Sequence, residues 1–183
     1  MVASSLGMSH QIASITTIAT PHYGSVTLNR LLCMPKPLWR IITVNIDKSA
    51  VRSGDRKPDS MKLLKELSTT YLKEFNKTNP NVSEVFYQSY SCVLKKPFSS
   101  FGMFLAKLVV KLLEGDNDGF VSVKSSKWGE EQYIVYSNTK KGISHQDAVD
   151  IKHKAFSNKS GNGVSDICDV YVSICKRLIE KGL

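Results

Sequence analysis

The feature that most restricts the fold is a β-branched, nearly uncharged run at residues 12–19 (Ile-Ala-Ser-Ile-Thr-Thr-Ile-Ala). Such a run is typical of a strand buried on both faces of a parallel sheet. Pro21 lacks an amide for the ladder and Gly24 permits a tight turn, so the strand is expected to end there. His22 follows the carboxyl end of this strand, where open α/β sheets carry their ligand-binding sites. It is a candidate site residue, with a loop histidine bonded to local backbone as the alternative.

Further strands and helices are predicted from periodicity and punctuation. Residues 60–76 show helical spacing with a restart at Ser68 or Thr69, and strands are predicted at residues 85–90 and 132–136. Together with the buried strand, these segments indicate an α/β fold with a parallel sheet.

The clearest element is a helix that closes the chain. Ser165 or Asp166 is expected to cap it, and Gly182 follows it. One apolar stripe should face the core, and consists of Ile167, Val170, Tyr171, Ile174, Leu178 and Ile179.

Two other segments leave alternatives open. Residues 26–59 lack a clean period, which favours a lid or binding loop over a pair of short helices covering the sheet. Residues 101–113 form a strongly apolar predicted helix that is too short to span a bilayer. We expect it to pack in the core, with an interfacial helix as the alternative.

The turn after this helix is acidic, with Glu114, Asp116 and Asp118 alternating before Gly119. A calcium loop of the EF-hand type would need Asp at its first position and Glu six residues after the glycine. The chain has Glu114 and Ser125 at those positions, which excludes that motif.

A different chemistry fits Asp118 and His145. A carboxylate can orient a histidine and stabilise its cation, and in α/β-hydrolases the order along the chain is serine, acid, histidine. Residues 120–123 are expected to leave the acidic turn as a Val-rich strand, and His145 follows the last predicted strand. Asp116 is a competing acid, and Asp147 is an alternative residue for holding the histidine loop.

Composition sets limits on partners. There are 25 Lys and Arg against 16 Asp and Glu, a net charge of +9, but the basic residues never form a long run. No nucleic-acid motif is present, so no nucleic-acid partner is expected, and an anionic lipid–water interface is the better functional use of the charge.

No apolar run reaches about 18 residues, so no transmembrane segment is expected. Four cysteines without a C-x-x-C motif weakly favour a reducing, intracellular compartment.

Five stretches resemble, in order, the landmarks of bacterial triacylglycerol lipases of the Pseudomonas–Burkholderia and clostridial branch. Residues 15–25 look like the T-T-I-x-T-P-H-x-G-S strand and turn, and residues 61–76 resemble the helix after the lid. Residues 117–123 match the N-D-G-L-V-S turn, residues 126–129 the S-A-K-W-G that follows, and residues 145–147 the H-L-D motif. The resemblance runs nearly end to end.

This resemblance implies the C-terminal half of an α/β-hydrolase, with a mostly parallel, doubly wound sheet. Residues 1–183 would form one domain portion with residues 26–59 as its lid. Asp118 would be the triad acid and His145 the triad base of a lipase or carboxylic ester hydrolase that requires no cofactor. Many such lipases bind a structural calcium through the position of Asp147, but Ile151 and Lys152 stand where another oxygen ligand is expected. Asp147 as a loop-stabilising acceptor is therefore the competing interpretation.

The nucleophile is not found in the sequence. No G-x-S-x-G motif occurs, and the resemblance places that elbow about ten residues before Met1. Residues 1–7 read as the tail of a helix closing at Gly7, so the chain is expected to begin inside an element. The chain alone is then expected to be inactive and, with residues 12–19 as an unpaired strand, poorly soluble. The alternative function is a noncatalytic lipase remnant that binds lipid or a partner, and an upstream in-frame serine elbow would discriminate between the two. A secretion signal on that upstream part would place the protein outside the cell.

Overall fold

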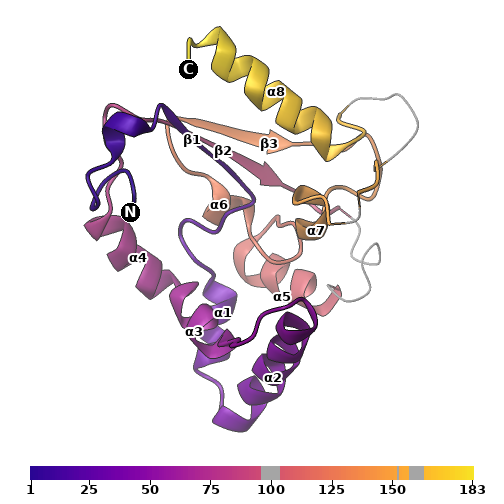
Figure 1. The fold of residues 1–183 in the computed structure, drawn as a ribbon. Coiled ribbons are helices and arrows are strands. Elements are labelled where there is room, and N and C mark those ends of the chain that lie inside the picture. Colours follow the sequence, from indigo (N-terminus) through magenta and orange to yellow (C-terminus); the bar gives the residue numbers. More distant parts are fainter. Residues whose placement is uncertain (96–103, 152, 157–162) are drawn as a thin grey trace.

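A parallel three-stranded sheet organises the computed structural model, which describes residues 1–95, 104–151, 153–156 and 163–183 (Figure 1). The strand order is β1 (Ser14–Ile18), β2 (Phe86–Cys92) and β3 (Glu131–Val135), with β2 in the middle. Ile15 lies opposite Tyr87, and Ser89 lies opposite Gln132. The α/β class and the strands predicted at 85–90 and 132–136 are confirmed.

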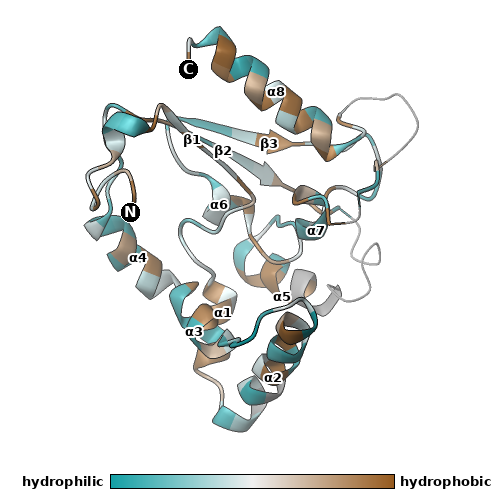
Figure 2. Cartoon of the chain, in the orientation of Figure 1, coloured by the Kyte–Doolittle hydropathy of each residue, from teal (hydrophilic) through white to brown (hydrophobic). Residues whose placement is uncertain are grey.

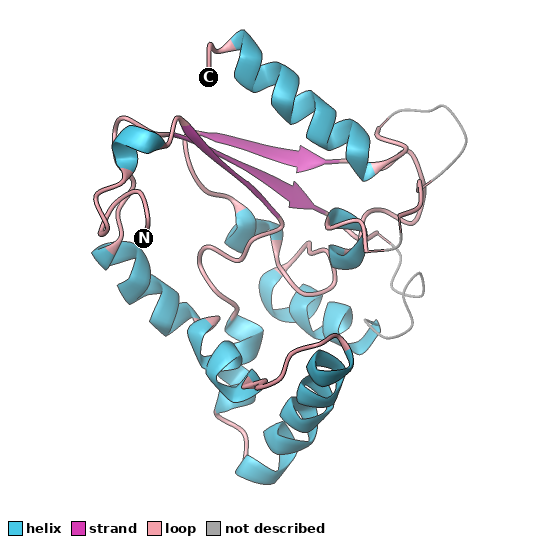
Figure 3. Ribbon diagram, viewed as in Figure 1, coloured by secondary structure: helices cyan, strands magenta, loops and turns pink. Residues whose placement is uncertain are grey.

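Helices lie on both sides of this sheet (Figure 3). Helix α8 runs along one side, whereas α1 to α6 lie on the other (Figure 1). No helix in the described ranges combines the length and hydrophobicity that crossing a bilayer requires. The bounds are η1 (Ser9–Gln11), α1 (Val26–Leu32), α2 (Lys36–Arg52), α3 (Ser60–Glu66), α4 (Thr69–Thr78), α5 (Phe104–Glu114), α6 (Val123–Ser126), α7 (His145–Ala148) and α8 (Ile167–Glu180).

Capping side chains set several helix starts. The hydroxyl of Ser68 accepts the Tyr71 amide at 3.3 Å, which separates α3 from α4 where a restart was predicted. The carboxylate of Asp166 accepts the Cys168 amide at 2.9 Å and begins α8. Both caps follow from the preference of short polar side chains for free helical amides.

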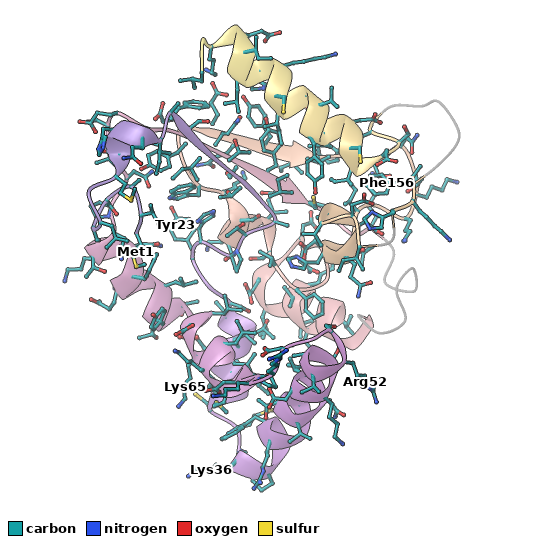
Figure 4. The ribbon with its side chains drawn as sticks, in the orientation of Figure 1. Met1, Tyr23, Lys36, Arg52, Lys65 and Phe156 are labelled. Carbon is teal, nitrogen blue, oxygen red and sulfur yellow. The ribbon has the colours of Figure 1, made fainter. Side chains whose placement is uncertain are left out.

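The main core lies between α8 and the sheet. Tyr90, Val135 and Ile143 meet Ile167 and Ile174 of α8, and all five are buried. Figure 2 shows hydrophobic residues along α8 and β3, and Figure 4 shows side chains filling the space between them. Each fully buried aliphatic side chain contributes roughly 1.5–3 kcal/mol, so this layer holds α8 in place. Ile179, expected in the stripe, is instead 72% exposed because it lies on the far side of the last turn.

Three expectations about the strands and the N-terminus are corrected. Strand β1 is shorter than residues 12–19, and its five residues are half-buried because it forms the edge of the sheet. The predicted strand at 120–123 is wrong, since Ser122 caps a short helix, α6, that begins at Val123. Residues 1–7 form turns and no α-helix.

Residues 26–59 contain two helices, α1 and α2, which is closer to the alternative of a helix pair than to a binding loop. Among the described residues, helix α1 packs mainly against α3 and α5, and α2 packs mainly against α3. Figure 1 shows α2 at the end of the molecule farthest from the strands. A role for them as a lid stays a prediction.

Helix α5 departs from the expected core packing. Val110 is buried, but Leu108, Val109 and Leu112 are exposed, and Leu112 is 84% exposed. The predicted start at Phe101 lies outside the described residues. Over residues 108–114, the helix therefore buries little of its apolar surface, although it packs against α1.

A tight backbone crossing precedes α7. Gly142 has φ +81°, and a Cβ built there would lie 2.3 Å from the Val93 carbonyl oxygen and 2.5 Å from the Lys95 amide nitrogen. The next residue, Ile143, donates its amide to Val93 at 2.8 Å. Only glycine allows this approach, which fixes the segment that leads into α7.

Replacing Gly142 with alanine should therefore lower the free energy of unfolding by more than about 2 kcal/mol, because the methyl group meets backbone on both sides. Gly54→Ala is the matched control, because Gly54 also has positive φ but a Cβ added there would meet no atom within 4 Å. It should cost about 1 kcal/mol. Urea unfolding measures both, and equal losses would contradict the steric explanation.

Candidate active site

The turn after α5 buries one carboxylate and fixes its direction. Asp118 is 1% exposed, and its Oδ1 accepts the amides of Phe120 at 3.0 Å and Val121 at 2.8 Å. The Asp118 amide donates to the Val121 carbonyl at 3.1 Å, which closes the turn. The intervening Gly119 has φ +113°, a conformation that favours glycine. Oδ1 is thus occupied by backbone, and Oδ2 is left to face another group.

That group is His145, the first residue of α7. Its Nδ1 lies 2.7 Å from Asp118 Oδ2, and its backbone amide donates to the Asp118 carbonyl at 2.9 Å. Ser144 caps α7, so the histidine is held by a helix start as well as by the acid. The side chain of His145 is 33% exposed. The structure therefore brings together the two residues that the sequence singled out.

The electrostatics of the pair suit a base. The hydrogen bond that His145 donates to the Asp118 carboxylate raises the pKa of His145 above its usual value, against the lowering effect of burial, and the Asp118 charge raises it further. An ionised carboxylate only accepts hydrogen bonds, so Nδ1 carries the proton and Nε2 presents its lone pair. The ring of Phe120 stands edge-on to the imidazole, with centroids 5.8 Å apart.

Other titratable groups nearby are less suited to catalysis. Asp116, the competing acid, lies at the surface 4.0 Å from the Lys111 ammonium. Cys92 is 2% exposed, and burial together with the charges of Asp118 and Asp147 raises the pKa of its thiol to about 12. A thiol with that pKa is not a nucleophile at neutral pH.

Asp147 stabilises the histidine loop. Its Oδ2 accepts the Ser144 amide at 3.0 Å, and its own amide donates to the Ser144 hydroxyl oxygen at 3.2 Å, which together form a capping box. Oδ2 also accepts the Ser144 hydroxyl at 2.6 Å, and the Lys141 ammonium lies 3.6 Å away. Within the described ranges, no group of three or more His, Cys, Asp or Glu side chains is arranged to hold a metal ion. Lys152 lies outside those ranges. These bonds fit the loop-stabilising interpretation, and calcium binding at Asp147 stays a prediction.

His22 lies apart from this pair. Its Nε2 is 2.9 Å from the Thr17 hydroxyl, and its ring stacks on Trp128 with centroids 4.4 Å apart. Burial lowers its pKa to about 4, so the ring is neutral at physiological pH. It lines a hollow of about 560 Å³ that Met1 and Tyr23, both labelled in Figure 4, also line. The ring is thus bonded to a side-chain hydroxyl where a bond to local backbone was the alternative, and a site role for His22 stays a prediction.

One residue of the site escaped the sequence-based prediction. Glu114 was considered only as a calcium ligand, yet its carboxylate accepts hydrogen bonds from Ser25, Thr27 and Ser122. The available signal was an acidic residue at a helix C-terminus, where the helix dipole disfavours it.

The raised pKa of His145 has a consequence for stability. A pKa raised in the folded state adds stability that is fully present below the unfolded value, about 6.5, and is lost as pH rises through the folded value. From pH 6 to 8, the free energy of unfolding should therefore fall more in the native protein than in Asp118→Asn. In that variant burial dominates, so the pKa of His145 should drop to its usual value or below. Urea unfolding over this range measures the difference, and parallel curves would contradict the pairing.

Comparisons with known proteins give a sequence relative and a structural match. No family model matches the chain. The chain is 31% identical over 185 residues to "Triacylglycerol lipase 2" of Saccharomyces cerevisiae, a similarity that covers 94% of this chain. The chain spans about half the length of that curated relative, 50%. Among solved structures, the lipase BlEst2 of Bacillus licheniformis in its mature form matches with a TM-score of 0.46 and 19% identity, over 70% of this chain and 50% of that one. By its sequence similarity, the chain is a relative of a triacylglycerol lipase.

Proposed function

We propose that this chain supplies the acid and base of a serine ester hydrolase that acts on lipid esters, with Asp118 as the acid and His145 as the base. The observation that carries the proposal is the 2.7 Å contact between Asp118 Oδ2 and His145 Nδ1, which leaves Nε2 as the acceptor. The name of the yeast relative supports lipid esters as the substrate class. The motifs shared with Pseudomonas-type bacterial lipases support the finer assignment to that branch.

The proposed reaction is acyl transfer to water. Nε2 of His145 takes the proton of a serine hydroxyl as its oxygen attacks the ester carbonyl, and Asp118 stabilises the imidazolium. The imidazolium then returns the proton to the departing alcohol, leaving an acyl-serine. Water, deprotonated by the same nitrogen, releases the acid and regenerates the serine. No cofactor takes part in these steps.

The serine is proposed to come from outside residues 1–183. Among the described residues, no serine hydroxyl hydrogen-bonds to His145 Nε2, and no G-x-S-x-G motif occurs in the chain. The match to about half of the length of the yeast lipase is compatible with a part of a larger catalytic unit. Helices α1 and α2 are proposed as its lid, because Ile42 and Val51 of α2 present apolar side chains to the surface.

The purified 183-residue chain should therefore not hydrolyse short-chain esters, and serine-directed inhibitors should find no target. In the protein as its native source makes it, Asp118→Asn should lower kcat about 10⁴-fold. The two backbone amides at Oδ1 force the new amide group toward His145, where it donates to Nδ1 and moves the ring proton to Nε2. His145→Ala should lose activity at least as severely.

His153→Ala is the matched control, because His153 also pairs with an aspartate, Asp150, at 3.2 Å but at the surface. Its rate should equal that of the native protein. Ester hydrolysis in gene-edited extracts measures all three variants. Serine-inhibitor-sensitive hydrolysis by the isolated chain, or full activity in His145→Ala, would overturn the proposal.

The exposed apolar surface of α5 supports the second candidate, a lipid-binding remnant without catalysis. Leu108, Val109 and Leu112 are exposed beside Lys111 on this helix. Apolar side chains next to basic ones suit an anionic lipid–water interface.

Leu112→Asp should weaken co-sedimentation with anionic phosphatidylglycerol vesicles about tenfold, because one exposed leucine contributes roughly 1.5 kcal/mol or more when buried. Val172→Asp is the control, because Val172 is 52% exposed on α8, across the sheet from α5. Vesicle binding without hydrolysis in the native-source protein would favour the remnant. Equal binding by both variants would exclude α5 as the contact.

A further inference from the structure

The Glu114 carboxylate lies at the junction of three helices. It is the last residue of α5, and its Oε1 accepts from the Ser25 hydroxyl at 2.7 Å, the Thr27 amide at 2.9 Å and the Thr27 hydroxyl at 2.9 Å. Its Oε2 accepts from the Ser122 hydroxyl at 3.1 Å. A carboxylate at the C-terminus of its own helix is disfavoured by the helix dipole, so these four donors offset an unfavourable position.

Two of the donors are helix caps. The oxygen of Ser25 accepts the Leu28 amide at 3.3 Å to begin α1, and the oxygen of Ser122 accepts the Ser125 amide at 3.2 Å to begin α6. Each cap hydroxyl then has its proton left for an acceptor, which Glu114 provides. The carboxylate thereby fixes the direction of both hydroxyl groups.

Ser122 directly follows the turn that holds the acid. The preceding residue, Val121, donates its amide to Asp118 Oδ1 at 2.8 Å, and the following residue, Val123, donates to the Asp116 carbonyl at 2.8 Å. A shift of Ser122 therefore moves the amides that aim the Asp118 carboxylate at His145. Because the Oδ2–Nδ1 contact is short, small displacements weaken it.

We propose that Glu114 is a positioning residue for the Asp118–His145 pair, acting through the Ser122 hydroxyl. Its consequence for catalysis rests on the proposed function, whereas its effect on the pair is a property of the 183-residue chain alone. The carboxylate ties the acid turn to α1 and α5, and so couples the pair to the helices proposed as the lid.

The test is an NMR titration of His145 in the 183-residue chain, comparing the native protein with Glu114→Gln, Ser122→Ala and Thr27→Val. Glu114→Gln and Ser122→Ala remove the two ends of one hydrogen bond, and each should lower the pKa of His145 by about half a unit or more. Thr27→Val removes a donor on the α1 side and keeps the link to the turn, so its His145 should titrate as in the native protein. In the Glu114→Gln/Ser122→Ala double variant, the pKa of His145 should fall by no more than the larger of the two single-variant shifts.

Three results would overturn the proposal. An unchanged His145 titration in Ser122→Ala would show that the Glu114–Ser122 hydrogen bond does not orient the Asp118 carboxylate. If the pKa of His145 shifts in Glu114→Gln but not in Ser122→Ala, the effect comes only from the lost negative charge of Glu114, because Ser122→Ala keeps that carboxylate. An equal shift in Thr27→Val would indicate general loosening.

Folding and function are checked separately. Backbone NMR spectra establish that each variant is folded, and if Glu114→Gln unfolds, Ser122→Ala and Thr27→Val still decide between positioning and loosening. In the native-source protein, Ser122→Ala should lower kcat severalfold with KM unchanged, whereas Thr27→Val should leave both unchanged. If the proposed function fails, His145→Ala retains activity while the titration shifts persist, so the two failures are distinguishable.

Discussion

The pairing of β2 with strands on both sides is the constraint on which the remaining structure depends. Strand β2 buries three polar residues beside its apolar ones, since Gln88, Ser89 and Ser91 are all fully buried. Each finds a partner: Gln88 donates to the Thr16 hydroxyl at 2.9 Å, Ser89 accepts the Trp128 amide at 2.8 Å, and the Ser91 hydroxyl meets that of Ser126 at 2.8 Å. Unpartnered buried polar groups are costly, so these bonds select one register and hold the α6 segment against the sheet. The turn of Asp118 and the loop of His145 are thereby placed at the carboxyl end of the strands.

Much of this arrangement could be predicted from the sequence, because it depends on local rules. The caps at Ser68 and Asp166 and the strands β2 and β3 follow from residue type and spacing, whereas the choice of Asp118 and His145 rested mainly on the resemblance to lipases. Val-rich residues 120–123 were misassigned because periodicity favours a strand there, whereas the cap at Ser122 begins a helix. The exposure of β1 and α5 could not be predicted, because burial depends on which elements cover a segment and not on its own composition.

The role proposed for Glu114 shows why a search for local sequence motifs can miss a functional side chain. Three of its four hydrogen bonds come from residues 87 or 89 positions away in the chain. No local sequence pattern predicts such a contact, because it arises from the packing of α1 against α5. The cost of a carboxylate at a helix C-terminus is a general clue, since a locally unfavourable residue often has a tertiary reason.

Two histidine–aspartate pairs occur in the described part of the chain, and their difference explains what makes one of them a candidate for catalysis. His153 and Asp150 are three residues apart in the chain, and the histidine side chain is 85% exposed, so solvent and rotamer freedom leave their attraction weak. Asp118 is 1% exposed, with one oxygen taken by two amides, so its other oxygen has a fixed direction and little competing water. His145 is held by its own amide as well as by its ring. Proximity of acid and base is therefore not sufficient, and the backbone bonds that remove alternative orientations distinguish a pair that is organised for proton transfer.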